Sequence, residues 1–175
     1  MASLVPQILK ASDYAKRLRI NFVSASSLLK EGKNLAFVEL QHETFLLTKH
    51  LLLKDSDYCE NFFTEYIPGV FNGTHDIISC SVNEKTVATV IFEKEARAID
   101  LLYVEPYFRK RGIATALLEK FCFSKIRTAQ PRIIIPGFEK EEFSGIIKKY
   151  RWVESRIIEP GLDNHCAEYR YVFNA

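Results

Sequence analysis

The chain has 175 residues, of which 47% are hydrophobic and 26% are charged, and its formal net charge is +2. This length suits one globular domain with enough apolar mass for a core, and so small a charge does not select nucleic acid or an anionic membrane as a partner. The four cysteines form no C-x-x-C pair, which argues against a structural zinc site, so we expect no bound metal.

The sequence shows no pattern of a secretory leader or of a bilayer-spanning segment. The start, MASLVPQILK, lacks a basic leader followed by a long apolar run. The apolar segment Phe45–Leu53 is short and contains Lys49 and His50, so it does not suit a bilayer. We therefore expect a cytoplasmic protein without a membrane partner.

The first part of the chain is predicted to be an extension followed by strands and a helix. Residues 1–43 are expected to pack on, or to precede, the core, with a helical and irregular start. Two apolar runs with β-forming residues, Asn34–Leu40 and Thr44–Leu53, predict strands. A helix should follow near residue 56 and be ended or interrupted by Pro68-Gly69.

The middle of the chain predicts a hairpin, a further strand and a helix. The runs Asp76–Val82 and Lys85–Phe92 are joined by Asn83-Glu84, which is typical of a β-hairpin. A strand over Arg97–Val104 should come next. From Gly112 to Arg127 the apolar residues recur at helical spacing and form one stripe.

The last third continues with a strand, a helix and a strand. Arg132–Ile135 is a short apolar run that predicts a buried strand. The following stretch, EKEEFSGIIKKY, has helical periodicity, with glutamates at its start and lysines at its end, as the helix dipole favours. Ala167–Phe173 alternates like a half-buried strand. This order predicts a mixed α/β domain on a largely antiparallel sheet.

A basic, glycine-containing loop precedes the helix that begins at Gly112. Arg109, Lys110 and Arg111 add positive charge where a helix N-terminus exposes unpaired N–H groups, and Gly112 has no Cβ to keep a ligand from the backbone. A diphosphate would fit there, although the sequence has neither G-x-x-x-x-G-K-[ST] nor G-x-G-x-x-G. A solvated basic turn is the alternative interpretation.

The surroundings of this loop resemble the signature of the GNAT superfamily of acyl-CoA-dependent N-acyltransferases. A strand ending in Val104-Glu105-Pro106 is followed by Arg109-x-x-Gly112-x-Ala114 and an apolar helix, as in the family motif R/Q-x-x-G-x-G/A after L-x-V-x-P. The resemblance covers roughly residues 44–173. It implies a GNAT-like α/β (α+β) domain over residues 44–175, with a mostly antiparallel central sheet flanked by helices and a helical N-terminal extension. It also implies direct transfer of an acetyl group from acetyl-CoA to a primary amine.

The resemblance further implies how acetyl-CoA would be held. The loop from Arg109 to Thr115 would bind the diphosphate, and the pantetheine arm would pair like an extra strand with Leu102 and Val104. In this family that strand splays from the next one, here Arg132–Ile135, and leaves backbone groups free for the arm. The implied cofactor-binding residues are Leu102, Val104, Arg109, Lys110, Arg111, Gly112, Ala114 and Thr115.

The residues for proton transfer depart from the family pattern. Some members carry a glutamate at the position of Ala98; Asp100 lies two residues on, should project from the same face, and is our candidate base. Many members place a tyrosine on the last helix as the acid, but Ile147 occupies that position here. Tyr150, three residues further along, is the candidate to replace it, and its helical position also fits a core residue.

The acceptor is expected to be a small-molecule or peptide amine. In this family the first helix and the last hairpin set specificity, which correspond to Asp57–Phe71 and Glu159–Ala167 here. The first segment is aromatic and carries Glu60 and Glu65, which would attract a cationic amine. Core aromatics and solvated carboxylates are the alternative interpretation.

Two other classes of function compete with an active transferase. A degenerate member that binds acyl-CoA as a regulatory or interaction module would fit the missing tyrosine and the N-terminal extension. A nucleic-acid binder would need aromatic and basic residues interleaved on a sheet, whereas this basic loop adjoins a helix mouth. A homodimer stays open. His75 is expected to be a turn residue, and nothing in the sequence joins Cys80 to a partner for thiol chemistry.

Overall fold

The computed structural model describes residues 19–52, 60–95, 98–122, 132–136, 140–158 and 166–171. The expected helical start, the start of the helix near residue 56 and most of the last hairpin loop, residues 159–165, lie outside the described residues. The described segments form one seven-stranded sheet in the order β1-β2-β3-β4-β5-β7-β6. The strands are β1 Ile20–Ser24, β2 His75–Val82, β3 Lys85–Glu93, β4 Ala98–Val104, β5 Arg132–Pro136, β6 Trp152–Ile158 and β7 Cys166–Tyr171.

Helices flank this sheet. Among the strand pairs described, β4 and β5 are parallel and the others are antiparallel, so the predicted mixed α/β domain on a mostly antiparallel sheet is confirmed. The α-helices are α2 Ala25–Lys30, α3 Asn34–Leu52, α5 Ile67–Asn72, α6 Ile113–Leu117 and α7 Lys140–Lys149. The shorter helical turns are η1 Phe62–Tyr66, η2 Pro106–Phe108 and η3 Leu118–Cys122.

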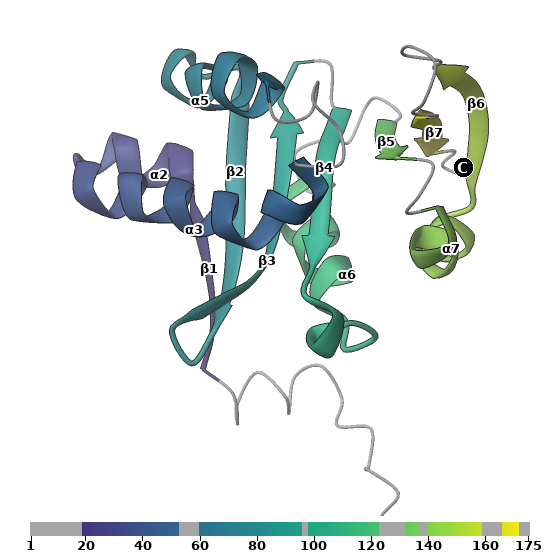
Figure 1. Cartoon of the computed structure of the whole chain (residues 1–175), viewed down its shortest axis with the longest axis horizontal. Coiled ribbons are helices and arrows are strands. Elements are labelled where there is room, and N and C mark those ends of the chain that lie inside the picture. The colour runs from purple at the N-terminus through teal and green to yellow at the C-terminus, as the bar shows by residue number, and fades with distance from the viewer. Residues whose placement is uncertain are drawn as a thin grey trace, which may run out of the picture.

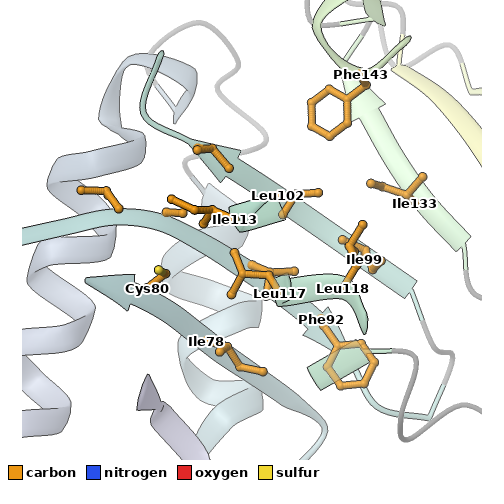
Figure 2. Packing of buried hydrophobic residues seen from close by; sticks show 14 of the residues in the cluster. Ile78, Cys80, Phe92, Ile99, Leu102, Ile113, Leu117, Leu118, Ile133 and Phe143 are labelled. Carbon is orange, nitrogen blue, oxygen red and sulfur yellow. The ribbon is translucent and has the colours of Figure 1, made fainter. Parts of the chain in front are cut away.

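Two hydrophobic clusters cover the two faces of the sheet. On one face, α2 and α5 lie against β2, and α3 runs across the sheet toward β4 (Figure 1). Phe37, Phe62 and Leu101 are buried on this face. On the other face, α6 packs Ile113 and Leu117 against the sheet, together with side chains that Figure 2 shows from close by. Strand β4 contributes to both clusters and therefore lies between two buried layers.

The first part of the chain folds differently from the prediction. The runs Asn34–Leu40 and Thr44–Leu53 are not strands, because α3 extends continuously from Asn34 to Leu52. Its buried stripe consists of Phe37, Leu40, Thr44 and Thr48, while Leu35, Val38 and Leu46 are exposed. Two threonines on the buried side and three apolar residues on the exposed side conceal the helical period in the sequence.

Strand β1 lies in the segment expected to be an N-terminal extension that packs on, or precedes, the core. It pairs with β2 along its whole length, from Ile20↔Val82 to Ser24↔Ile78. The boundary expected after residue 43 falls inside α3, and neither β1 nor β6 was predicted.

The middle of the chain follows the prediction more closely. The β2–β3 hairpin turns at Asn83 and Glu84, whose φ angles of 49° and 70° suit a tight two-residue turn. Strands β4 and β5, the helical turns from Ile113 to Cys122, α7 and β7 are present as expected. Pro68 does not end its helix, because it lies in the first turn of α5, which continues to Asn72.

Candidate functional site

Among the described residues, one edge of β4 pairs with a neighbouring strand over only part of its length. Within the described residues it pairs with β5 at Ala98↔Arg132 and Ile99↔Ile133, and the register contains no later pair. Its other edge stays paired with β3 as far as Val104↔Ala88. Figure 1 shows β5, β7 and β6 turning away from β4. The backbone groups on this edge of β4 are therefore available to a strand-like ligand.

The loop after β4 brings backbone N–H groups together. Lys110 and Gly112 both have positive φ angles, 58° and 83°. The helix that follows has no side-chain cap, and its first described internal bond runs from the Ala116 N–H to the Gly112 carbonyl, 2.9 Å. The N–H groups of residues 113–115 precede that bond. A Cβ on Gly112 would meet no atom within 4 Å, so this position opens onto free space.

A cavity of about 620 Å³ joins the open edge of β4, this loop and α7. It is lined by all the predicted cofactor-binding residues except Arg111, whose guanidinium Cζ lies over the Tyr107 ring, 5.0 Å from its centroid. Helix α7 supplies one wall of the cavity, and none of its wall residues was predicted to bind the cofactor. That wall consists of Glu141, Glu142, Phe143, Ser144, Gly145, Ile146 and Lys149.

Charged contacts tie the walls of this cavity together. Arg109 Nε donates to the Val104 carbonyl, 2.8 Å, which fixes the loop to the end of β4. The same guanidinium forms an ion pair with Glu142 across the cavity. Lys149 Nζ donates to Thr115 Oγ1, 3.3 Å, beside the helix mouth. The cavity thus contains cations suited to an anionic ligand, of which Arg109 is paired with Glu142 and Lys149 with Glu119, 3.2 Å.

Asp100 occupies a β-bulge in β4. Ile91 pairs with Leu101 whereas Phe92 pairs with Ile99, so Asp100 is the extra residue of β4. The bulge breaks the strict alternation of the strand. Asp100 consequently shares the α5 side of the sheet with Ala98, whereas Leu102 and Val104 face α6.

His75 is a partner of Asp100 that could not be predicted from the sequence. It was expected in a turn, but it is the first residue of β2, only 5% exposed. Its Nε2 lies 3.7 Å from Asp100 Oδ2, and its Nδ1 lies 2.9 Å from Thr74 Oγ1. No sequence motif joins a histidine at residue 75 to an aspartate two strands away, and only the sheet brings them together.

Tyr150 lies in the core on the opposite side of the sheet from Asp100. Its side chain is buried in the cluster beneath α6, and its hydroxyl donates to Glu119 Oε1, 2.8 Å. This hydrogen bond is the main reason why the pKa of Glu119 lies below its ordinary value. Tyr150 is not among the residues that line the cavity, although the neighbouring Lys149 is.

The aromatic segment expected to bind the acceptor is divided between core and surface. Phe62 and Tyr66 are buried, whereas Phe63 and Phe71 are more than half exposed. Glu60 and Glu65 are exposed as well, while Tyr58 and the residues before Cys166 in the last hairpin lie outside the described part of the chain.

Other kinds of chemistry find little support in the described residues. Burial raises the pKa of the Cys80 thiol to about 11, so the thiol stays protonated and is a poor nucleophile. No group of three or more His, Cys, Asp or Glu side chains gathers there as a metal site. Within the same residues, no helix combines the length and apolarity that crossing a bilayer requires.

Comparisons with known proteins identify the fold through solved structures. No family model matches the sequence, and no curated protein matches it either. Solved structures do match: a GNAT-family acetyltransferase from Bacillus cereus superposes with a TM-score of 0.58 at 15% identity, covering 86% of this chain and 95% of that one.

Two further acetyltransferase structures agree with this match. One is an acetyl transferase from Salmonella typhimurium that modifies the N-terminal serine of ribosomal protein L7/L12, with a TM-score of 0.55 at 12% identity over 89% of this chain and 95% of that one. The other, from Thermus thermophilus, has a TM-score of 0.51 at 12% identity over 63% of this chain and 72% of that one. This chain therefore has the fold of the GNAT superfamily.

Proposed function

We propose that the protein is an N-acetyltransferase that moves an acetyl group from acetyl-CoA directly to a primary amine. The observation that carries the proposal is the cavity that extends from the partly unpaired edge of β4 to the N-terminus of the helix at Gly112. An elongated molecule with an amide-containing arm and a diphosphate matches these two features. Acetyl-CoA is such a molecule, and it supplies the acetyl group as a thioester.

The described residues fit such a donor. The N–H groups around Gly112 and Ala114, together with the positive φ of Lys110, provide a cradle for the diphosphate. Arg109 and Lys149 add cations within the same cavity. The free edge of β4 around Leu102 offers peptide groups to the arm, which would run from the loop toward the point where β4 and β5 separate.

The transfer step balances with Asp100 as the base. The nitrogen lone pair of the amine forms a bond to the carbonyl carbon, and the carbon–sulfur bond breaks with its electron pair on sulfur. The proton lost from nitrogen goes to a carboxylate oxygen of Asp100, and sulfur takes a proton from solvent. The support for this role is that Asp100 lies next to Ile99, the last β4 residue paired with β5, although it does not line the cavity itself.

The acceptor is proposed to be a primary amine of a small molecule or a peptide. The described surface near η1 and α5 offers exposed Phe63 and Phe71 with the carboxylates of Glu60 and Glu65, a combination suited to a cationic amine with an apolar part. One of the similar structures modifies the N-terminal serine of a ribosomal protein, an acceptor of the peptide class.

The proposal is tested by measuring thiol release from acetyl-CoA with a panel of small amines, polyamines and peptides. Amine-dependent thiol release, with acetylated amine found by mass spectrometry, would establish the activity. Acetyl-CoA binding without release for any amine would favour the regulatory or interaction module instead. Absence of acetyl-CoA binding would refute both.

A further inference from the structure

We propose that His75 is a positioning residue for the reaction, which holds and shares the proton that Asp100 takes from the amine. The proposal rests on the proposed acetyl transfer and adds a residue to it. His75 and Asp100 are only 5% and 8% exposed, and they approach to 3.7 Å between Nε2 and Oδ2. Because His75 lies on β2 and Asp100 on β4, their side chains meet across β3.

The bulge in β4 is what makes this pairing possible. Without an extra residue at Asp100, the strict alternation of β4 would place the aspartate on the face of Leu102 and Val104, under α6. With the bulge it lies beside His75 on the α5 side. Bulges commonly redirect a side chain beside an active site, and this one lies directly after the last β4–β5 pair.

The imidazole of His75 is held in one position by three neighbours. Thr74 Oγ1 lies 2.9 Å from Nδ1, and the Tyr66 ring lies 5.7 Å from the His75 ring between centroids. Gly69 of α5 approaches so closely that a Cβ there would lie 2.2 Å from Nδ1. Gly69 has no positive φ that would require a glycine, and a glycine inside a helix lowers stability by about 1 kcal/mol relative to alanine. The physical reason for a glycine at this position is therefore the space that it leaves for the imidazole ring of His75.

The hydrogen bonds around Thr74 assign the proton on the far side of the ring. The Thr74 N–H and hydroxyl both donate to Asn72 Oδ1, at 3.0 and 2.8 Å. With its proton given to Asn72, the Thr74 oxygen accepts from His75 Nδ1–H. Nε2 therefore has a lone pair to offer toward Asp100. One proton shared between Nε2 and Oδ2 would join the two atoms, so the geometry lets the pair hold one proton.

Among the described residues, further ionisable groups lie beside the pair. Tyr66 comes from η1, and Glu93 of β3 is the cross-strand partner of His75. Helix α5 has no ionisable side chain. In the reaction, the proton leaves the amine nitrogen for the Asp100 carboxylate and is then shared between Oδ2 and His75 Nε2, so the buried carboxylate becomes part of a pair without net charge.

The test compares His75→Gln with a matched His42→Gln control, which changes an exposed histidine of α3. Glutamine keeps a polar group near the position of Nε2 but does not titrate. We expect His75→Gln to bind acetyl-CoA within about two-fold of wild type, to lower turnover at neutral pH by about ten-fold or more, and to move the acidic limb of the pH–rate profile to lower pH. His42→Gln should match wild type. If His75→Gln has the same pH–rate profile and the same turnover as wild type, the proposal is overturned.

A double-mutant cycle with Asp100→Asn separates a positioning role from simple packing. If His75 acts through Asp100, adding His75→Gln to Asp100→Asn should cost less than about two-fold more in turnover. Fully additive losses would contradict the proposal. Gly69→Ala offers a second route, since its Cβ must displace the ring, and it should reproduce the His75→Gln pH profile.

Imidazole ¹⁵N NMR supplies a readout that needs no activity. We expect the His75 signals to show a proton on Nδ1 and the Nε2 resonance to change in Asp100→Asn. An unchanged Nε2 resonance would show that the two residues are not coupled and would refute the inference, even if acetyl transfer itself is found. Failure of acetyl-CoA to bind, with the coupling intact, would instead count against the proposed function alone.

Discussion

The two sides of β4 carry different kinds of polar groups. On the α6 and α7 side, the cavity is open and its charges are in contact with solvent, as shown by the 48% exposed Glu142 that reaches Arg109. On the α5 side, Asp100 and His75 are buried among aromatic and aliphatic neighbours. Under the proposed function, the open side would bind the large anionic donor, and the closed side would hold the proton taken from the amine.

The bulge at Asp100 connects the two sides. A buried carboxylate is costly unless it is paired, so a polar pair in the core needs a reason beyond stability. On this account, variants of the open side should change acetyl-CoA affinity and leave the chemistry intact. Variants of the closed side should do the reverse.

Asp100→Asn should produce the largest effect. Removing a positioned general base lowers turnover by about 10²–10⁴-fold, while acetyl-CoA affinity should stay near that of wild type. The check is a pH–rate profile measured together with calorimetric binding of acetyl-CoA. An acidic limb that survives unchanged in Asp100→Asn would remove Asp100 as the base.

Gly112→Asn should weaken acetyl-CoA binding on the open side and leave the closed side unchanged. Asparagine tolerates positive φ better than other residues with a Cβ, so the fold should survive while the side chain fills the space above the loop. We expect the dissociation constant of acetyl-CoA to rise by about ten-fold or more, equal to about 1.4 kcal/mol. Gly73→Asn is the matched control, because the φ angle of Gly73, +86°, is similar to that of Gly112, +83°. A Cβ at either glycine would meet no atom within 4 Å. Equal affinity in both variants would make the loop a solvated turn.

Tyr150→Phe should have a small effect on turnover, less than about ten-fold, because its hydroxyl is bonded to Glu119 rather than directed into the cavity. Its effect on stability should depend on pH. The bond lowers the folded-state pKa of Glu119, so its contribution is present above the ordinary pKa of a glutamate and is lost as pH falls through the lowered value. Thermal melts of wild type and variant should therefore differ at neutral pH and converge in acid. A constant difference would contradict this assignment.

Glu142→Gln should have the smallest effect, and in the opposite direction. The Glu142 carboxylate pairs with Arg109 inside the cavity and competes with a phosphate for it. We expect acetyl-CoA to bind up to about five-fold more tightly, the range of a solvent-exposed ion pair. Glu31→Gln removes a comparable pair with Lys33 and is the control. Weaker binding in Glu142→Gln would show that the carboxylate helps to hold the donor.

The open side was largely predictable from sequence and the closed side was not. Arg109, Gly112 and Ala114 belong to one short motif, so a local pattern predicts where they lie. The proposed roles of His75 and Gly69 depend on contacts between segments that are distant in the sequence. The β-bulge cannot be recognised from the residue types of β4. Helix α3 was mistaken for strands because tertiary packing buries Thr44 and Thr48 and leaves apolar Leu35 exposed. The α7 wall was not predicted, because the helix dipole already explained the glutamates at its start and the lysines at its end.

The most direct test of the account is calorimetric titration of the wild-type chain with acetyl-CoA, followed by thermal melts at saturating ligand. The account predicts a measurable heat of binding and a higher melting temperature, because ligand at about 100 times its dissociation constant adds about 2.7 kcal/mol of stability. Gly73→Asn should behave like wild type, and Gly112→Asn should show a reduced shift at the same concentration. If acetyl-CoA produces neither heat nor a shift in the wild-type chain, the cavity beside β4 is not a donor site and the central claim is wrong.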